Sequence, residues 1–550
     1  MCGIWALIEK TKLTKEDLVK YLGDFWSIKH RGPDNSHLQT FDKSYIGFHR
    51  LAIMDTSVAS NQPYIIHDQD RTIVFVCNGE IYNYSELDRK YNLSINKSDC
   101  LAIPKLYIKL GEKAWLDLFR YEIKGEFAFM MFEFDNISRL SKYYIGRDMV
   151  GVRPLYTVED NTTIDIYSSE IKGMMNYQDK VKEFEPSTIR IVEYDSFDYK
   201  TRTVNFNSIY EYINDTMKIH VDEEYSLGQI RNSVINSVKR RLVSDRPIAF
   251  LLSGGVDSSL VASISCRILG QPIKTFCCGI KGSTDMKYAK IVADHIGSIH
   301  TEVYFTEEEG LELIKDVVYT TETWDTTTVR ASVGQYIVSR YISQNTDCKV
   351  VLVGEGPDEV CSSYLFNYYA PSDKDLHSTA EEYVKDIHMY DGRRADRCIA
   401  RWGLEGRIPL LDPEFITAYW NVDASKRLPT YNMEKYMLRK AFDRDDLLPK
   451  EVLWRKKEAF SDGISSKEKS WYQVIQEYVK KQVDCKNKIF AEPSFPHTPE
   501  ATYYRTLFRK YFGLNRDTII PRFWQPKWDK NGKVIESYVD PSARTLQVYI

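Results

Sequence analysis

Strict alternation of short apolar strands with amphipathic helices is the feature that most limits how this chain can fold. The alternation begins near residue 225. We predict strands at 248–252, 273–280, 300–305 and 349–354, and helices at 258–270, 285–297, 310–322 and 333–343. Strand–helix–strand repetition predicts a doubly wound parallel sheet. Ligands bind such sheets at the carboxyl ends of the strands.

The first 205 residues have a different sequence pattern, in which short stretches of alternating apolar and polar residues are interrupted by two helical patterns. We predict strands at 72–83, 125–135, 140–148 and 163–170, and helices at 15–30 and 100–119. This pattern predicts sheets with helices packed outside them. The polar stretch at 205–225 lacks periodicity, and the chain after 380 is helical in pattern. We therefore expect two domains, at 2–205 and 225–550.

Charge and cysteine usage exclude several classes of protein. A formal net charge of -4 without a basic patch argues against nucleic acid as a partner. The ten cysteines are scattered without zinc-site spacing, which indicates reduced thiols and a cytoplasmic protein. No apolar run approaches the ~18 residues that a membrane span needs. The sequence leaves the oligomeric state open, with a homodimer as one option.

The stretch FLLSGGVDSS at 250–259 carries the strongest chemical signal. Two glycines directly after a buried strand let backbone N–H groups approach an anion, and the following helix adds its positive end. Asp257 would repel phosphate unless a cation lies between them, which suggests Mg²⁺. The pattern is not a Walker loop, because no Gly-Lys-Ser/Thr follows. The alternative interpretation is a tight strand–helix turn with Asp257 as the N-cap.

The stretch VVLVGEGPDEV at 350–360 repeats this arrangement with carboxylates. Both loops leave the same edge of the predicted sheet, so they can face each other. Asp257 and Asp358 could then hold one Mg²⁺, which leaves Glu355 free to act on a substrate. An acidic turn in solvent is the alternative.

The amino terminus, MCGIWAL, suggests acyl chemistry. If Met1 is removed, Cys2 carries both a thiol and an α-amine whose pKa lies near neutrality, so one residue supplies nucleophile and base. The oxyanion that forms needs donors, and CNGE at 77–80 offers an amide side chain and a backbone N–H. Arg50 and Asp99 are candidates for binding the charged groups of an α-amino acid, although a single Arg or Asp in a sequence is more often a surface charge.

Two ordered sets of motifs resemble one family, the glutamine-dependent asparagine synthetases of eukaryotic type. The first set resembles the class II glutamine amidotransferase domain and consists of MCGIWAL, HRGPD, GFHRLAIMD, NGEIYN, GRDMVGVRPLY and SSE. The second set resembles the synthetase domain and consists of LLSGGVDSS, VGEGPDE, RADR, GLEGRIPLLD, KEAFSDG and DPSARTL. The resemblance implies an N-terminal Ntn-hydrolase αββα sandwich. A doubly wound PP-loop ATP pyrophosphatase domain with C-terminal helices would follow it.

The resemblance also implies roles for individual residues. Cys2 would attack glutamine to form a glutamyl thioester, with Asn78 and Gly79 as the oxyanion hole. The expected glutamine-binding residues are Arg50, Leu51, Ala52, Ile53, Met54, Asn78, Gly79, Glu80 and Asp99. The released ammonia would travel through an internal passage to the second site.

At the second site, ATP would adenylate L-aspartate to β-aspartyl-AMP, which ammonia then attacks. The resemblance implies ATP contacts from Leu252, Ser253, Gly254, Gly255, Asp257, Ser258, Cys278, Val353 and Gly354. It assigns Mg²⁺ to Asp257 and Asp358. Glu355 would act in adenylate formation, and Lys457 would balance phosphate charge. The stretch LWRKKEAFSDG at 453–463 otherwise indicates an ordinary helix end with cations.

Four departures from the family pattern concern the two sites. Val353 replaces a usual serine, Pro357 a small residue, and VCSSY at 360–364 a Phe-Gly-Gly-Tyr type of segment. Leu101 stands where the glutaminase pocket usually has Glu. Two alternatives stay open: an amidotransferase-synthetase that acts on another acid, and a catalytically silent nucleotide-binding protein. The presence of Cys2 argues against the β-lactam-forming relatives, which lose this nucleophile.

Overall fold

The computed structural model forms two compact units, which are described separately. It describes residues 1–95, 98–159, 163–177, 181–194, 199–206, 222–429, 433–456, 463–465, 469–482 and 498–538. The first unit comprises residues 1–212 with 243–246 and 400–405. The second comprises residues 213–242, 247–399 and 406–550.

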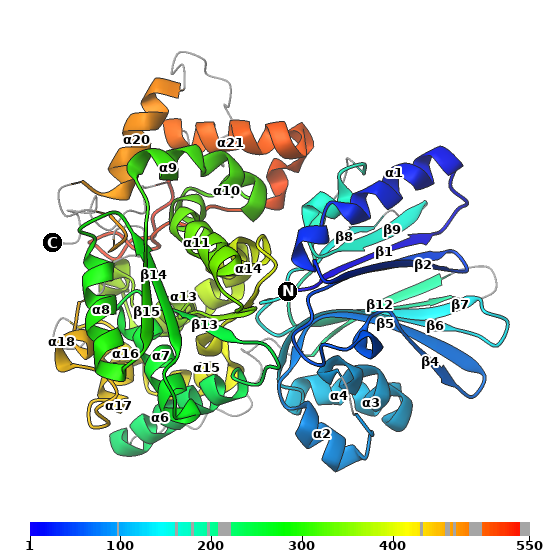
Figure 1. Cartoon of the computed structure of the whole chain (residues 1–550), viewed down its shortest axis with the longest axis horizontal. Helices are drawn as coiled ribbons and strands as arrows, with labels where there is room; N and C mark the ends of the chain where they lie inside the picture. The colour runs from blue at the N-terminus through cyan, green and yellow to red at the C-terminus, as the bar shows by residue number, and fades with distance from the viewer. Residues whose placement is uncertain are drawn as a thin grey trace. The chain divides into compact units, whose positions relative to one another are not determined.

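The first unit contains two six-stranded antiparallel sheets. One sheet has the order β10-β8-β9-β1-β3-β2, formed by Lys182–Glu183, Tyr156–Glu159, Ile164–Ser168, Gly3–Glu9, Ser44–Arg50 and Asn35–Phe41. The other has the order β12-β11-β7-β6-β5-β4, formed by Tyr199–Asn205, Thr188–Tyr194, Leu140–Arg147, Gly125–Phe134, Arg71–Ile81 and Tyr64–Asp68. Each helical layer lies outside one sheet (Figure 1). The predicted αββα sandwich is confirmed.

The helices of this unit are α1 (Lys15–Trp26), α2 (Tyr84–Tyr91), α3 (Ala102–Leu110) and α4 (Glu112–Tyr121). Helix α1 covers the sheet that contains β1, and α2, α3 and α4 cover the sheet that contains β5 (Figure 1). The single helix predicted at 100–119 is wrong. Gly111 has a φ of 76°, a conformation that suits glycine, and it separates α3 from α4.

Both faces of β5 are buried, which explains its continuous apolar run. Ile73, Phe75 and Cys77 belong to the core under α2–α4, whereas Val74 and Val76 belong to the core between the sheets. This alternation follows from the two-residue repeat of a strand. Burying one such large side chain stabilises the fold by about 1.5–3 kcal/mol.

The second unit is built on a sheet of order β15-β14-β13-β16-β17. Its strands are Ile299–Tyr304, Lys274–Gly279, Ile248–Leu251, Val350–Leu352 and Glu405–Arg407. Strand β13 pairs in parallel with both β14 and β16, and β14 pairs in parallel with β15. The predicted parallel sheet is therefore confirmed, and β17 is an addition to it.

Helices connect and cover these strands. They are α6 (Glu223–Arg240), α7 (Val256–Leu269), α8 (Thr284–Ile296), α9 (Glu307–Glu312), α10 (Ile314–Thr321), α11 (Thr326–Asn345), α12 (Pro357–Val360), α13 (Asp373–Asp386), α14 (Asp391–Ala400), α15 (Pro413–Trp420), α16 (Ala424–Arg427), α17 (Tyr436–Ala441), α18 (Lys450–Leu453), α20 (Trp471–Gln482) and α21 (Pro499–Phe512). The helix predicted at 310–322 is two helices, α9 and α10. Helix α11 begins seven residues before the predicted start at 333, because Asp325 caps its N-terminus through Thr328.

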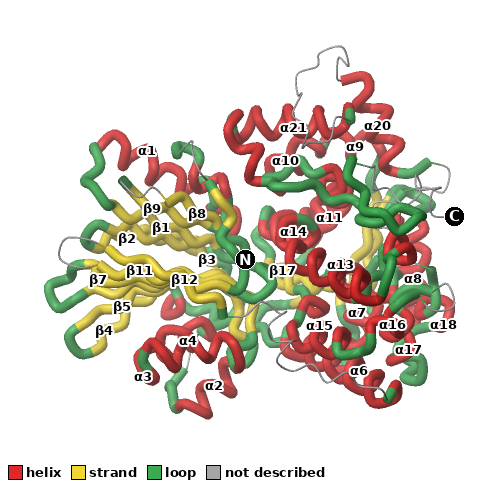
Figure 2. Tube along the Cα trace, turned by 180° about the vertical axis from the view of Figure 1, so that it is seen from behind, coloured by secondary structure: helices red, strands yellow, loops and turns green. Residues whose placement is uncertain are grey.

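The strand order creates a crevice between β13 and β16. The chain runs outward from β13 to β14 and β15, then returns to place β16 on the other side of β13. Helices α7 and α8 cover one face of the sheet and α11 the other, as Figures 1 and 2 show from opposite sides. The loops after β13 and β16 therefore diverge at their carboxyl ends, which is where open α/β sheets bind ligands.

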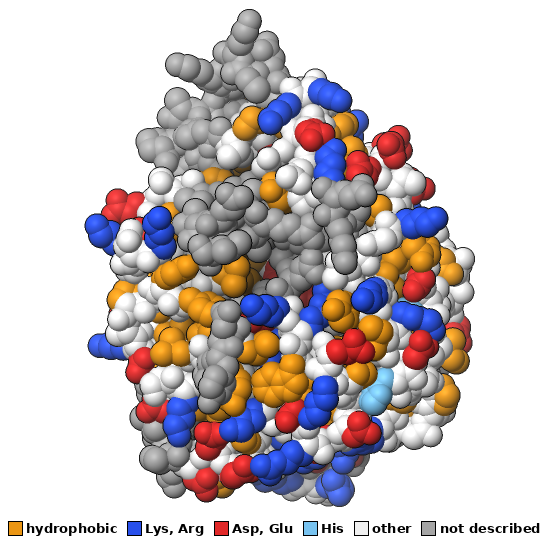
Figure 3. Space-filling view, turned by 90° about the vertical axis from the view of Figure 1, so that its left-hand side faces the viewer, with side chains coloured by type: hydrophobic (Ala, Val, Ile, Leu, Met, Phe, Trp, Pro, Cys, Tyr) orange, Lys and Arg blue, Asp and Glu red, His pale blue; other side chains and the backbone are white. Residues whose placement is uncertain are grey.

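The outer surface mixes both signs of charge. On the face drawn in Figure 3, Lys and Arg side chains are interspersed with Asp and Glu among the described residues. Within the described ranges, no helix combines the length and apolar character that crossing a membrane requires.

Candidate active sites

The register of β1 places Cys2 beside the segment predicted to bind glutamine. Gly3 pairs with His49 across β1 and β3, so residue 2 faces the end of β3. The Cys2 Sγ lies 3.4 Å from the Leu51 backbone nitrogen and 3.6 Å from its carbonyl oxygen. The thiol therefore rests against the 50–52 backbone.

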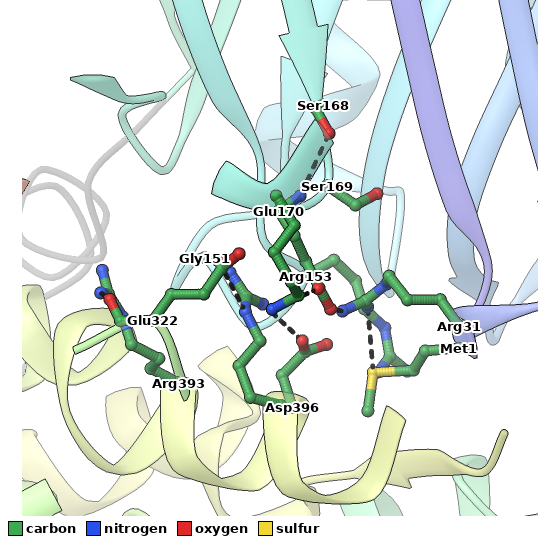
Figure 4. A network of polar contacts seen from close by, with 12 residues as sticks. Met1, Arg31, Gly151, Arg153, Ser168, Ser169, Glu170, Glu322, Arg393 and Asp396 are labelled. Carbon is green, nitrogen blue, oxygen red and sulfur yellow. Dashed lines mark hydrogen bonds and ion pairs between the residues drawn. The ribbon is translucent and has the colours of Figure 1, made fainter. Parts of the chain in front are cut away.

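A buried ion-pair cluster fixes the backbone of Cys2. The Arg31 Nε donates to the Cys2 carbonyl at 2.9 Å, and its Nη1 donates to Glu170 at 2.7 Å. Lys172 Nζ lies 2.9 Å from the Glu170 carboxylate. Figure 4 shows Arg31, Glu170 and Met1 in one cluster. The Ser168 hydroxyl oxygen accepts a hydrogen bond from the Glu170 backbone N–H. Burial alone would raise the pKa of Glu170, but the charges of Lys172, His30 and Arg31 hold it well below its usual range.

We expect Glu170→Gln to lower the free energy of unfolding by about 3–5 kcal/mol at pH 7, because Arg31 and Lys172 lose a buried counter-charge. The Glu170 pKa is depressed in the folded state, so its contribution is present above the unfolded value and is lost as pH falls through the folded value. The stability gap between wild type and variant should therefore narrow in acid. Denaturant unfolding at several pH values measures this, and a gap unchanged down to acid pH would contradict it.

Met1 is buried when it is present. Its terminal nitrogen donates to the Leu404 carbonyl at 2.8 Å, and the residue is 1% exposed. Burial lowers the pKa of this amine to about 5 and raises the pKa of the Cys2 thiol to about 11. A thiol with that pKa is almost wholly protonated at neutral pH, so Cys2 is a poor nucleophile while Met1 is attached.

The end of β5 carries an amide group that suits an oxyanion hole. Both the Nδ2 and the Oδ1 of Asn78 are buried, and neither has a hydrogen-bond partner among the described residues. Such orphaned polar groups are costly unless a ligand satisfies them. Gly79 follows with a φ of 157°, and a Cβ there would lie 2.2 Å from the Glu126 carbonyl oxygen. Only glycine fits this position.

The other predicted glutamine-binding residues lie in the 50–54 segment, beside Cys2, and near the end of β5. The Asp99 carboxylate accepts the Ile81 N–H at 2.6 Å, next to Gly79 and Glu80 on β5. Arg50 Nη1 donates to the Ser57 carbonyl at 2.6 Å and to Asn61 at 2.8 Å, so part of its guanidinium is occupied by the 55–61 loop. Arg50 and Asp99 thus contact different segments. Backbone groups of Ala52 and Ile53 bond Asp34 and Asp245, and Met54 is half-buried.

A cavity in the second unit lies in the crevice between β13 and β16. Both carboxylate-bearing loops contribute to its lining. Nine of the residues predicted for this site line it, namely Leu252, Ser253, Gly255, Asp257, Ser258, Cys278, Gly354, Glu355 and Asp358. The placement of these two loops at one edge of the sheet, predicted from the sequence, is thus observed.

Two predicted ATP contacts, Gly254 and Val353, lie outside this lining, and the predicted catalytic residue Lys457 lies outside the described residues. Gly254 has a φ of 72°, and a Cβ there would lie 2.5 Å from the backbone of Tyr288. Its role is to let α8 pack against the loop. Val353 is buried and donates its N–H to the Arg407 carbonyl at 3.1 Å. Lys457 falls outside the described ranges, so its role stays a prediction.

The Glu355 carboxylate accepts hydrogen bonds from two other residues of the cavity lining. Gln335 Nε2 donates to its Oε1 at 3.1 Å, and Arg394 Nη2 lies 3.5 Å from the same oxygen. Burial raises the pKa of Glu355, and the charge of Arg394 opposes this rise. The result is a carboxylate whose proton affinity is higher than usual, which suits a group that accepts a proton.

Lys435, at the start of α17, lines the cavity although no sequence motif points to it. Its Nζ lies 2.5 Å from an oxygen of Asp257 and 2.5 Å from an oxygen of Asp358. Burial would lower its pKa, but the two carboxylates outweigh burial and the pKa is raised. No motif links position 435 to the two loops, so only the fold could bring it there.

The departures from the family pattern also have structural explanations. Pro357 occupies the first turn of α12, where a missing N–H costs nothing. Ser362, in the place of a usual glycine, takes a φ of 52°. The Ser363 hydroxyl donates to Asp358, a contact that glycine could not make. Leu101 packs against the core under α2–α4.

Cations from the 453–456 segment also reach the cavity. Arg455 and Lys456 line it. Arg455 Nη1 donates to the Gly254 carbonyl at 3.2 Å, and its guanidinium lies 4.1 Å from the centre of the Tyr288 ring. The segment follows the end of α18 at Leu453, as the helix-end interpretation predicts, and it also lies beside the glycine loop.

Comparison with known proteins places both parts of the chain in known families. The asparagine synthase family matches residues 229–381 and 370–531, and the glutamine amidotransferase domain matches residues 1–236. The glutamine-hydrolysing asparagine synthetases of Gallus gallus and Homo sapiens are each 35% identical to this chain, over 100% of it and 99% of their own length. The chain belongs to the asparagine synthetase family.

This assignment rests on sequence identity over the full length. A solved glutamine phosphoribosylpyrophosphate amidotransferase of B. subtilis aligns with 51% of this chain and 67% of its own, at 18% identity and a TM-score of 0.31. Such a partial match adds nothing to the asparagine synthetase assignment. The resemblance seen in the ordered motifs is confirmed.

Proposed function

We propose that this protein converts L-aspartate, L-glutamine, ATP and water to L-asparagine, L-glutamate, AMP and pyrophosphate. The observation that carries the proposal is 35% identity, over the whole chain, to relatives named glutamine-hydrolysing asparagine synthetases. In this proposal residues 2–205 form the glutaminase domain and residues 225–550 the synthetase domain.

Glutamine hydrolysis is assigned to the Cys2 end of the first unit. Once Met1 is removed, the α-amine of Cys2 accepts the thiol proton, and the sulfur attacks the side-chain amide carbon of glutamine. Asn78 Nδ2 and the Gly79 N–H donate to the oxyanion that develops. Arg50 binds the α-carboxylate through its remaining N–H groups, and Asp99 binds the α-amine. Ammonia leaves, and water then hydrolyses the glutamyl thioester.

Aspartate activation is assigned to the cavity of the second unit. The Gly255 backbone and the hydroxyls of Ser253 and Ser258 contact phosphate oxygens at the start of α7. Glu355 serves adenylate formation and takes the proton of the incoming ammonium, which leaves neutral ammonia to displace AMP. Lys457 is assigned to balance phosphate charge.

The residues of the cavity fit a divalent cation. Among the residues that the structure describes, the Oδ1 of Asp257 is buried without a hydrogen-bond partner. The Asp257 and Asp358 carboxylates converge on one point, where the Lys435 ammonium lies. We assign these two carboxylates to Mg²⁺, which when bound would neutralise phosphate charge. The nine described cysteines are free thiols, which supports a cytoplasmic location.

Release of pyrophosphate tests the proposal directly. The full-length protein is incubated with ATP, Mg²⁺ and glutamine, with and without aspartate, and then with other amino acids that carry a side-chain carboxylate in place of aspartate. We expect release that depends on aspartate and a matched yield of asparagine. Release with another acid would point to a different product. ATP binding without any release would mean a silent nucleotide-binding protein.

Asn78→Ala tests the oxyanion assignment. We expect the glutaminase kcat to fall by about 10²–10³-fold, the usual effect of removing one donor of this kind. Synthesis from added ammonium should be unchanged, because Asn78 belongs to the first unit. Glutaminase and ammonia-dependent rates are compared on the same preparation. A glutaminase kcat close to that of wild type would remove Asn78 from the mechanism.

A further inference from the structure

Lys435 occupies the position between the two carboxylates that the proposed function assigns to Mg²⁺. Its Nζ lies 2.5 Å from Asp257 and 2.5 Å from Asp358, and its side chain is 3% exposed. It comes from the start of α17, more than 70 residues beyond Asp358 in the sequence. One ammonium therefore bridges the loop after β13 and the loop after β16.

The backbone at this position is held in an uncommon conformation. Lys435 has a φ of 57° and a ψ of 30°, the left-handed region that residues other than glycine seldom adopt. Such conformations persist where the surrounding structure imposes them, and they cluster at functional sites. Here the conformation begins α17 and turns the lysine toward the cavity that it lines.

Two other cations of the cavity, Arg439 and Arg455, each donate to a backbone carbonyl. Arg439 Nε donates to the Glu434 carbonyl at 2.8 Å, and Arg455 Nη1 donates to the Gly254 carbonyl at 3.2 Å. Lys435, by contrast, contacts both carboxylates of the pair. The Ser363 hydroxyl donates to Asp358 as well, so this carboxylate is oriented by a neutral donor in addition to the ammonium.

The charge balance of the pair decides what it can bind. Two carboxylates and one ammonium sum to one negative charge in a buried site. A free divalent cation entering beside the ammonium meets a like charge at short range, and the buried site screens this repulsion poorly. A cation that arrives with ATP brings phosphate oxygens, which can accept the displaced ammonium.

We propose that Lys435 is the resident counter-ion of the nucleotide-free site: it neutralises Asp257 and Asp358, prevents free divalent cations from binding there, and moves to phosphate oxygens when the metal–nucleotide complex enters. The proposal rests on the assignment of these carboxylates to Mg²⁺ in the proposed function. It makes metal binding dependent on nucleotide.

Mn²⁺ binding to the nucleotide-free, full-length enzyme tests the proposal, with electron paramagnetic resonance of free Mn²⁺ as the readout. We expect Lys435→Met to bind Mn²⁺ at least about tenfold more tightly than wild type, because a repelling charge is removed and two carboxylates are released. Lys435→Arg keeps the charge and should bind like wild type. Lys440→Met, on the same helix and paired with Glu223, is the matched control and should also bind like wild type. Wild-type affinity in Lys435→Met would overturn the proposal.

A second arm needs no substitution of Lys435 and therefore does not depend on whether that variant folds. Wild-type enzyme is titrated with Mn²⁺ in the absence and presence of an ATP analogue that cannot be cleaved between the α and β phosphates. We expect binding at least about tenfold tighter with the analogue, beyond what the analogue alone binds. Equal affinities would overturn the proposal.

Asp257→Asn separates failure of this proposal from failure of the proposed function. With the analogue present, this variant should lose most of the enzyme-dependent Mn²⁺ binding. If it binds Mn²⁺ like wild type, the assignment of the carboxylates to the metal is wrong. If it loses binding while Lys435→Met gains none, the metal assignment stands and the role of Lys435 falls.

Discussion

Replacing Cys2 with alanine is expected to abolish asparagine synthesis from glutamine while leaving synthesis from ammonium salts intact. The glutamine-dependent rate should fall by roughly 10³-fold or more, because the nucleophile of the first half-reaction is gone. All the described residues that line the cavity belong to the second unit, so aspartate activation should continue. Asparagine formation with each nitrogen source measures both rates.

Cys2→Ser is the matched control, since it keeps a hydroxyl in place of the thiol. It should fold like wild type and lack glutamine-dependent synthesis. Mass spectrometry of both variants must show that Met1 has been removed, so that the comparison concerns the side chain alone. Loss of the ammonium-dependent rate in Cys2→Ala would show that the two sites are not separable.

The reverse pattern is expected for Glu355→Gln. We expect synthesis from either nitrogen source to fall by about 10²–10⁴-fold, the range for losing a general base, while glutaminase activity persists. Gln335 and Arg394 contact the Glu355 carboxylate, and a neutral amide in its place keeps the shape but accepts no proton. Pyrophosphate release and glutamate release from one sample measure the two activities.

The pH profile provides an independent check on Glu355. Its pKa is raised by burial, so the basic form that the reaction needs is lost as pH falls through a value above the usual carboxyl range. The wild-type synthetase rate should therefore decline in mild acid. The residual rate of Glu355→Gln should not show this decline. Asparagine yield at the wild-type level in the variant would refute the assigned role.

Local patterns were enough to predict the architecture and the two loops that contribute to the cavity lining. The parallel sheet follows from apolar strands such as 248–252 that alternate with helices, and the two loops follow from the glycines and carboxylates after β13 and β16. The break at Gly111 was missed, because a glycine in a helical pattern is equally compatible with a continuous helix.

Long-range contacts were not predictable. Lys435 is carried to Asp257 and Asp358 by the packing of α17, and nothing in its neighbouring residues indicates two carboxylate partners. Gln335 and Arg394 likewise reach Glu355 from different helices. The Arg31–Glu170 pair joins residues more than 130 positions apart, which no periodicity in the sequence records.

The buried position of Met1 has a consequence for biosynthesis. Its terminal nitrogen is bonded to the Leu404 carbonyl and sheltered from solvent, so an aminopeptidase has no access to it in the folded protein. If Cys2 becomes the first residue as proposed, the aminopeptidase must remove Met1 from the nascent chain, before the sandwich has folded. Any molecule that folds ahead of this step keeps its methionine and remains a synthetase fed only by free ammonia. The share of such molecules in a preparation would then set its ratio of the two activities.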